Sequence, residues 1–178
     1  MTRLHSAPVS DATGHAAQLF AAIKAAAGMV PPAYVDIGSN SAPALDGALH
    51  LDAMQRQGTL LAQDVEIVKL AVSEVNHCDY CLAAHSFLGH KQGLDQARIQ
   101  AVRAGSATGD ARIDALVAFT RELVTTSGTL PAPSVAAIKA AGFTDAQIVD
   151  IVLAITSITF TNLFNRINDT AIDFPAAG

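Results

Sequence analysis

The chain has 178 residues, of which 51% are hydrophobic and 15% are charged, and its formal net charge at pH 7 is −5. This length suits a single domain over residues 1–178, which can bury roughly 70% of its unfolded surface without disulfide bonds. The acidic balance and the lack of any run of Lys or Arg argue against a nucleic-acid partner.

Helical periodicity fills nearly every interval between the Gly and Pro residues, and it predicts an all-α fold with no strand. The first helix is expected to stop at Gly28, because the prolines that follow cannot continue it. The expected helices cover residues 11–27, 33–37, 43–58, 62–75, 76–92, 95–104, 110–126, 134–141 and a last long helix from residue 144.

Three of these helices have informative sequences. Residues 62–75 are apolar over most of the helix circumference, as expected for a central helix. Asn76 is expected to cap the next helix, with Asp79 in the place of the capping-box acid. Thr144 and Gln147 form a capping box that opens the last helix. Its apolar segment, 148–164, is interrupted by an acid and several hydroxyl groups, which favours a buried helix over a membrane span.

The amino-terminal residues 1–14 have no apolar core of the length that a signal peptide requires. We therefore expect a cytoplasmic protein without a membrane partner. Thiols are kept reduced in the cytoplasm, so a close pair of cysteines there more often does redox or metal chemistry than structural cross-linking.

The segment NHCDYCLAAH, residues 76–85, contains both cysteines of the chain. In a helix, positions i, i+3 and i+7 share one face, so Cys78, Cys81 and His85 are predicted to form one stripe. A helix N-terminus lowers a thiol pKa, and an imidazole can remove the thiol proton. Two thiols at this spacing can also close a disulfide after one is oxidised. The pattern favours a redox pair.

A metal site and a pair without function are the alternatives. Zinc needs a fourth ligand, for which His77 and His90 are the candidates, but one crowded helix offers poor tetrahedral geometry. No metal and no other cofactor are therefore expected.

Two acids compete to support the thiols. Glu66 lies in an otherwise apolar stretch, where a carboxylate is costly without a partner, although an exposed pair with Lys69 is the ordinary alternative. Glu74 lies nearer the helix junction, where exposure is expected. We favour Glu66, because the helix 62–75 packed antiparallel on the cysteine helix directs it toward the thiols. Tyr80 and His77 are secondary candidates.

One weak internal repeat is present. VEIVKLAVS at residues 65–73 resembles VDIVLAITS at residues 149–157, and the offset of 84 residues aligns Asn162 with Cys78 and Asn165 with Cys81. A single match between apolar helices suggests, without proving, an old duplication of a helix pair.

With these residues the chain resembles the alkylhydroperoxidase D-like (AhpD-like) group of the carboxymuconolactone decarboxylase family. The resemblance extends from GMVPPAYV at Gly28 through ALDGALHL, VEIVKLAVSEVNHCDYCLAAH and AGFTDAQIVDIV to the Asn-containing tail. Its strongest part is the pattern E-x11-C-x2-C-x3-H, formed by Glu66, Cys78, Cys81 and His85. It implies an all-helical fold, homo-oligomers such as trimers or hexamers, and thiol-dependent reduction of peroxides in antioxidant defence.

The resemblance also implies a role for each residue of the pattern. Cys81 becomes the thiol that attacks the peroxide, and Cys78 becomes the resolving thiol. His85 becomes the proton acceptor and Glu66 part of the proton relay. Some members have a second histidine just before the later cysteine, where this sequence has Tyr80, and this difference puts the relay and its reductant in question.

The leading expectation is thus a cofactor-free peroxidase that a dithiol compound or protein re-reduces. The runner-up is a lyase that acts on a carboxylated lactone, although family members called decarboxylases generally lack the cysteine pair. A redox-sensing interaction module without turnover is the third class.

Overall fold

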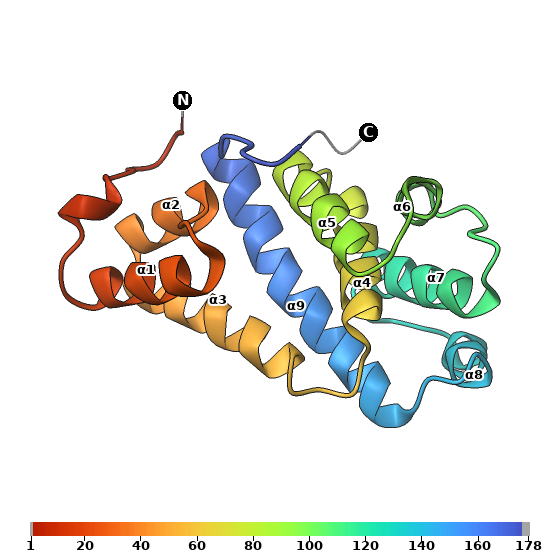
Figure 1. The fold of residues 1–178 in the computed structure, drawn as a ribbon. Helices are drawn as coiled ribbons and strands as arrows, with labels where there is room; N and C mark the ends of the chain where they lie inside the picture. The colour runs from red at the N-terminus through yellow and green to blue at the C-terminus, as the bar shows by residue number, and fades with distance from the viewer. Residues whose placement is uncertain (1, 176–178) are drawn as a thin grey trace.

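The computed structural model describes residues 2–175, and in this part of the chain all regular structure is helical, as predicted. Nine α-helices follow a short 3₁₀ helix at Val9–Asp11 (Figure 1). They are α1 (Gly14–Ala27), α2 (Pro32–Asn40), α3 (Ala42–Gln55), α4 (Ala62–Val75), α5 (Asp79–Lys91), α6 (Gln96–Ala104), α7 (Ala111–Thr125), α8 (Ala132–Ala140) and α9 (Asp145–Asn168).

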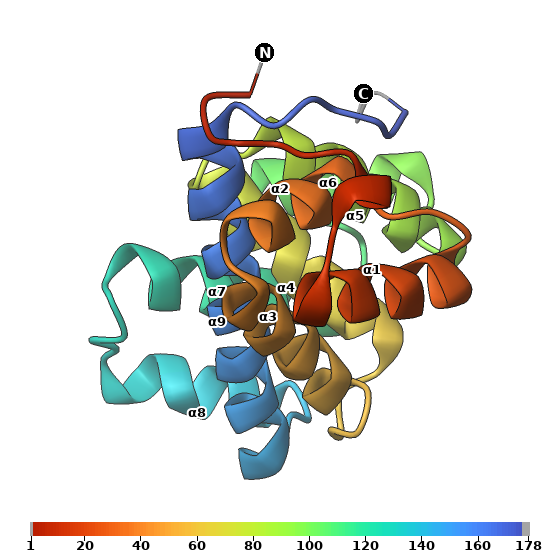
Figure 2. The ribbon, with the colours of Figure 1, turned by 90° about the vertical axis from the view of Figure 1, so that its left-hand side faces the viewer.

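Helix α9 runs through the middle of the molecule, between α1–α3 on one side and α4–α8 on the other (Figure 1). It packs against α3 and α4, which lie on its two sides. Figure 2 shows α1–α3 as a layer in front of α4 and α9. Two apolar clusters fill these layers, a larger one around α4 and a smaller one between α1, α2 and α3.

Helix α4 is the central helix that its sequence predicts, and its observed ends, Ala62 and Val75, are the predicted ones. Its middle is fully buried, and the apolar residues without exposed surface are Ile67, Val68, Leu70, Ala71 and Val72, with Lys69 buried among them. Helix α4 contacts α5, α7 and α9. Because neighbours surround it, side chains on several faces of α4 are held in fixed positions, and one of these faces carries Glu66.

Helix α9 begins at the predicted capping box. The Thr144 hydroxyl accepts a hydrogen bond from the Gln147 amide at 3.2 Å, and the Gln147 side chain accepts one from the Thr144 amide at 3.0 Å. In the described part of the chain, α9 is the one helix long and apolar enough to cross a membrane, judged by length and composition alone. Only 28% of the residues in its most apolar 18-residue window are buried, and Leu163 and Ile167 are exposed. The prediction of a buried helix is therefore only partly correct.

The expected cap of α5 is wrong. Helix α5 begins at Asp79 with Cys78 as its N-cap residue, and Asn76 instead ends α4. The intervening His77 has a left-handed backbone, with φ of 53°. Three residues between the helices are needed to turn the chain back on itself, so the cap moves from Asn76 to Cys78.

Two other helix starts differ from the prediction by more than one residue. Helix α1 begins at Gly14 rather than at residue 11, because residues 9–11 form the separate 3₁₀ helix. Helix α8 begins at Ala132, before the expected Ser134, since Pro133 fits the first turn, where its missing N–H leaves no hydrogen bond unmade.

Candidate active site

The α4–α5 turn places both cysteines inside the protein. Cys78 is the N-cap residue of α5 and Cys81 lies in its first turn; they are 1% and 2% exposed, and both are free thiols. His85 follows one turn later on the same helix. The predicted stripe of two thiols and an imidazole is therefore present at the start of α5, beneath the surface.

The pKa values of the two thiols are shifted in opposite directions. The hydrogen bond from the Cys78 thiol to the Cys81 sulfur lowers the pKa of Cys81 below that of an ordinary cysteine, and the charge of His85 lowers it further against the opposing effect of burial. The same hydrogen bond, together with burial, raises the pKa of Cys78. Because the thiolate is the nucleophile, these opposite shifts favour Cys81 over Cys78 as the nucleophilic sulfur of the reduced pair.

Glu66 holds the imidazole of His85. The Glu66 carboxylate lies 2.7 Å from Nδ1 of His85, and the two side chains are 13% and 12% exposed. With its proton on Nδ1 donated to Glu66, the ring keeps its Nε2 lone pair free to accept a proton. The alternative pairing of Glu66 with Lys69 is not formed, because Lys69 binds Asp52 at 2.9 Å.

The secondary candidates lie away from this pair. Glu74 forms an ion pair with Arg103 at 2.9 Å. His77 is exposed at the turn. Tyr80 is buried against Phe174, with ring centroids 5.7 Å apart, and its pKa is raised by burial and by the neighbouring carboxylate of the tail. None of the three contacts the His85–Glu66 hydrogen bond. Within residues 2–175, no group of three His, Cys, Asp or Glu side chains could hold a metal ion.

Helix α9 contributes asparagines that the motif does not include. Asn165 Nδ2 donates to Cys81 Sγ at 3.4 Å, and Asn162 Nδ2 donates to the Ser73 hydroxyl at 3.1 Å. Asn162 Oδ1 accepts from Asn76 at 3.0 Å. The weak internal repeat is the signal that points to them, since its offset of 84 residues separates the contacting pair Asn165 and Cys81.

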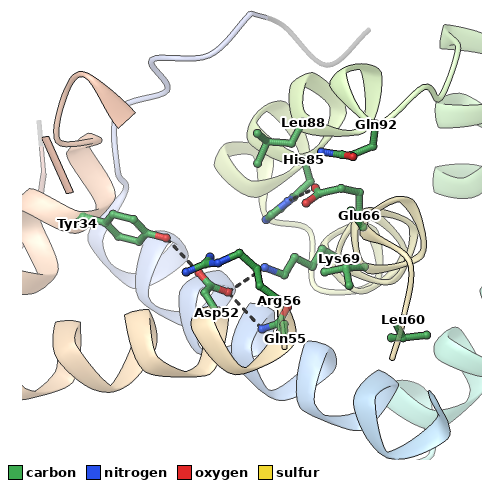
Figure 3. A pocket seen from close by; sticks show the side chains of 12 residues that line it. Tyr34, Asp52, Gln55, Arg56, Leu60, Glu66, Lys69, His85, Leu88 and Gln92 are labelled. Atoms are coloured by element: carbon green, nitrogen blue, oxygen red, sulfur yellow. Dashed lines mark hydrogen bonds and ion pairs between the residues drawn. The ribbon is translucent and has the colours of Figure 1, made fainter. Parts of the chain in front are cut away.

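A pocket of about 390 Å³ opens beside His85 and Glu66 (Figure 3). Its lining comes from α2, α3, α4 and α5 and from the segment between α3 and α4, and it includes Tyr34, Arg56 and Leu88. Neither cysteine is among the residues that line it. Cys81 is almost fully buried, so its sulfur is closed off from this pocket in the structure.

Asp52 organises the polar wall of this pocket. Its carboxylate accepts hydrogen bonds from Lys69 at 2.9 Å, Ser157 at 2.8 Å, Gln55 at 3.2 Å and Tyr34 at 3.3 Å. Burial alone would raise the pKa of Asp52, but the charge and hydrogen bond of Lys69 outweigh it and hold the pKa below its usual value. Asp52 and Tyr34 are not predicted from the sequence, because only packing between helices brings them to the pocket.

Comparison with known proteins gives a family match over part of the chain and a shared fold. Residues 44–122 match the model of the carboxymuconolactone decarboxylase family. No curated protein sequence matches the chain. A solved structure of a peroxidase-related protein with an alkylhydroperoxidase AhpD core, from Ralstonia eutropha JMP134, has 18% identity and a TM-score of 0.86, with 97% of this chain and 92% of that chain covered.

Two further solved structures have the same fold. A protein from Agrobacterium tumefaciens, described as a putative antioxidant defence protein AhpD, has 20% identity and a TM-score of 0.70, with 80% of this chain and 99% of that chain covered. A cysteine-to-alanine variant of the debrominase Bmp8, solved in complex with 2,3,4-tribromopyrrole, has 16% identity and a TM-score of 0.79, with 97% of this chain and 92% of that chain covered. At these identities the structures establish a shared fold.

Proposed function

We propose that the chain is a thiol-dependent peroxidase, because residues 44–122 match the carboxymuconolactone decarboxylase family and the fold is AhpD-like. The family match and the shared fold support the resemblance seen in the sequence, and they support a peroxidase-related role for the chain. The finer proposal depends on one observation. The acidic thiol Cys81 lies between the hydrogen-bond donor Cys78 and the imidazole of His85, which Glu66 holds at 2.7 Å.

The proposed cycle starts from the Cys81 thiolate, whose proton has passed to His85. The sulfur attacks one oxygen of a hydroperoxide, a new S–O bond forms and the O–O bond breaks. The leaving alkoxide takes the proton from His85 and departs as an alcohol, so Cys81 becomes a sulfenic acid. Cys78 sulfur then attacks Cys81 sulfur, and water departs with the Cys78 proton. An external dithiol reduces the resulting disulfide by exchange and is itself oxidised.

Reductive debromination is a second candidate, favoured by the likeness of the fold to that of Bmp8. Replacement of a carbon–bromine bond by a carbon–hydrogen bond consumes two electrons, and a dithiol that closes to a disulfide supplies two. The buried pair Cys78 and Cys81 is equally suited to this demand. The two functions therefore differ in the substrate that enters the pocket, and they share the thiol chemistry.

We also propose that the protein acts as a homo-oligomer in the cytoplasm, with a peroxide as substrate and a dithiol compound or protein as reductant. An exposed apolar stripe on α9, formed by Val149, Val152, Leu163 and Ile167, supports the oligomer, since a second copy of the chain would remove it from water. Light scattering of the purified protein measures the oligomer directly.

Steady-state turnover tests the proposal. The reduced protein is supplied with an excess of a small dithiol and, in separate assays, with an alkyl hydroperoxide, a brominated pyrrole or a carboxylated lactone. A peroxidase consumes the hydroperoxide continuously and oxidises one dithiol for each molecule, and the Cys81→Ser variant does not. Turnover of the brominated pyrrole alone favours the second candidate. Decarboxylation of the lactone by a protein without thiols contradicts both, and a single oxidation without turnover indicates a sensor.

A further inference from the structure

Asn165 is buried against the reactive sulfur from a distant part of the chain. It is 4% exposed, it belongs to α9, and its Nδ2 donates to Cys81 Sγ at 3.4 Å. A carboxamide N–H that donates to sulfur favours the thiolate over the thiol, because the charged form accepts the hydrogen bond more strongly. Half of this side chain thus serves the reduced, deprotonated state of Cys81.

The other half of the same carboxamide has no partner. Asn165 Oδ1 is buried and accepts no hydrogen bond within the described residues. Leaving a buried carbonyl oxygen unpaired is costly and rare in folded proteins, so an oxygen of this kind needs an explanation.

The other buried asparagines of α9 lack this feature. Asn162 Oδ1 accepts from the Asn76 side chain, and its Nδ2 donates to Ser73. Asn168 Oδ1 accepts from the Leu4 amide at 2.9 Å, and its Nδ2 donates to Asp36. Both ends of these two side chains are therefore paired, which is the usual behaviour of structural asparagines. Asn162 also lies beside the two thiols, so Asn165 differs from both neighbours in its unpaired oxygen.

Oxidation of Cys81 creates the missing donor. The thiolate has no proton to offer, whereas a sulfenic acid, S–O–H, carries one on an oxygen bonded directly to the sulfur. That oxygen lies one bond from an atom that the Asn165 carboxamide already contacts. A donor there is within reach of Oδ1, so the unpaired oxygen of the reduced state gains its partner in the oxidised state.

We propose that Asn165 is a positioning residue for Cys81 in both states of the cycle, with Nδ2 stabilising the thiolate and Oδ1 accepting the hydrogen bond of the sulfenic acid. The proposal has a donor half, the stabilisation of the thiolate by Nδ2, and an acceptor half, the hydrogen bond from the sulfenic acid to Oδ1. The acceptor half rests on the proposed peroxidase function, and the donor half does not. The sulfenic acid is thereby held until Cys78 attacks it, and its further oxidation is slowed.

Asn165→Leu tests both halves, because leucine has the same number and branching of side-chain heavy atoms and no hydrogen-bonding group. Asn165→Ala is the second variant, in case leucine disturbs the packing of α9. Thr156→Ala, an exposed change on the same helix, is the control. All are made in a Cys78→Ser background, so that the sulfenic acid of Cys81 cannot be resolved. Circular dichroism establishes that each variant is folded.

Thiolate absorbance of the reduced variants against pH tests the donor half without any peroxide. The loss of one charge-assisted hydrogen bond is expected to lower the acid dissociation constant of Cys81 by about tenfold in both Asn165 variants and to leave that of the Thr156 control unchanged. His85 and Tyr80 on α5, Tyr34 on α2 and Asn162 on α9 also act on this sulfur, and all four are retained in every variant. An unchanged titration overturns the donor half.

Trapping with dimedone after one equivalent of an alkyl hydroperoxide tests the acceptor half. Mass spectrometry is expected to show a sulfenic acid whose lifetime falls roughly fivefold in Asn165→Leu, with a matching rise in sulfinic acid. Equal lifetimes in the variant and the control overturn the acceptor half. Absence of any sulfenic acid, even in the control, overturns the peroxidase proposal together with this half, while the titration still decides the donor half.

Discussion

Glu66→Gln removes the carboxylate that holds His85 and keeps the size of the side chain. The distance of 2.7 Å and the burial of both side chains describe a hydrogen bond to a charged group that is shielded from water. Such bonds contribute about 1.5–3 kcal/mol, and loss of that stabilisation in the transition state slows a reaction by about 10- to 100-fold. We therefore predict that kcat/KM for an alkyl hydroperoxide falls about 10²-fold in Glu66→Gln.

Glu74→Gln is the matched control for this prediction. Glu74 lies on the same helix and makes an ion pair with Arg103, without contact to the imidazole. Its loss is expected to change kcat/KM by less than about twofold, since partly exposed ion pairs contribute little. Circular dichroism and light scattering establish that both variants keep the fold and the assembly. Full turnover in Glu66→Gln across the pH range, with turnover lost in Glu74→Gln, would refute the proposed relay.

Three further predictions concern the thiols and the pocket wall. Cys78→Ser and Cys81→Ser are each predicted to abolish turnover, and one equivalent of peroxide should leave an oxidised Cys81 in the Cys78→Ser variant. If mass spectrometry instead shows oxidation of Cys78 in the Cys81→Ser variant, the attacking and resolving roles of the two cysteines must be exchanged. The Cys81 thiol is predicted to titrate below the free-cysteine pKa of about 8.5, so peroxide consumption rises as the pH increases through this lowered pKa. Thiolate absorbance against pH measures the pKa, and an unshifted titration would refute the argument for an activated thiol. Asp52→Asn lowers the free energy of unfolding at pH 7 by about 2 kcal/mol, because Lys69 stays buried without its partner. Because the pKa of Asp52 is depressed in the folded protein, the stabilisation by its carboxylate is present above the unfolded pKa of about 3.9 and is lost as the pH falls through the folded pKa. Urea unfolding at pH 7 and at acid pH should therefore show a smaller difference in unfolding free energy between the wild type and Asp52→Asn at acid pH. An equal difference at both pH values would contradict this prediction.

The helices themselves were largely predictable, because local sequence determines them. The segment 62–75 is apolar on nearly every face, and α4 has those same ends. The capping box at Thr144 is a local hydrogen-bond pattern, and it forms as predicted. The cap at Asn76 is the exception. The tight turn between α4 and α5 shifts the helix start to Asp79, and a tertiary constraint of this kind is not visible in the local sequence.

The residues of the candidate site also differ in how far the local sequence predicts them. The spacing of Glu66 and His85 on two neighbouring helices predicts their contact, since only one short turn separates those helices. Asp52, Tyr34 and Asn165 come from α3, α2 and α9, and their place beside the site depends on how distant helices pack. Asp52 and Tyr34 are therefore found only in the structure, whereas the weak internal repeat already aligned Asn165 with Cys81.

A single turnover without added reductant tests the central claim most directly. The fully reduced protein is mixed with one equivalent of an alkyl hydroperoxide, and the alcohol, the remaining thiols and the cysteine peptides are measured together. The account predicts that each molecule of peroxide becomes one alcohol while both thiols disappear into a disulfide between Cys78 and Cys81. Peroxide consumed with both thiols still free, or thiols that one equivalent leaves untouched, would contradict it.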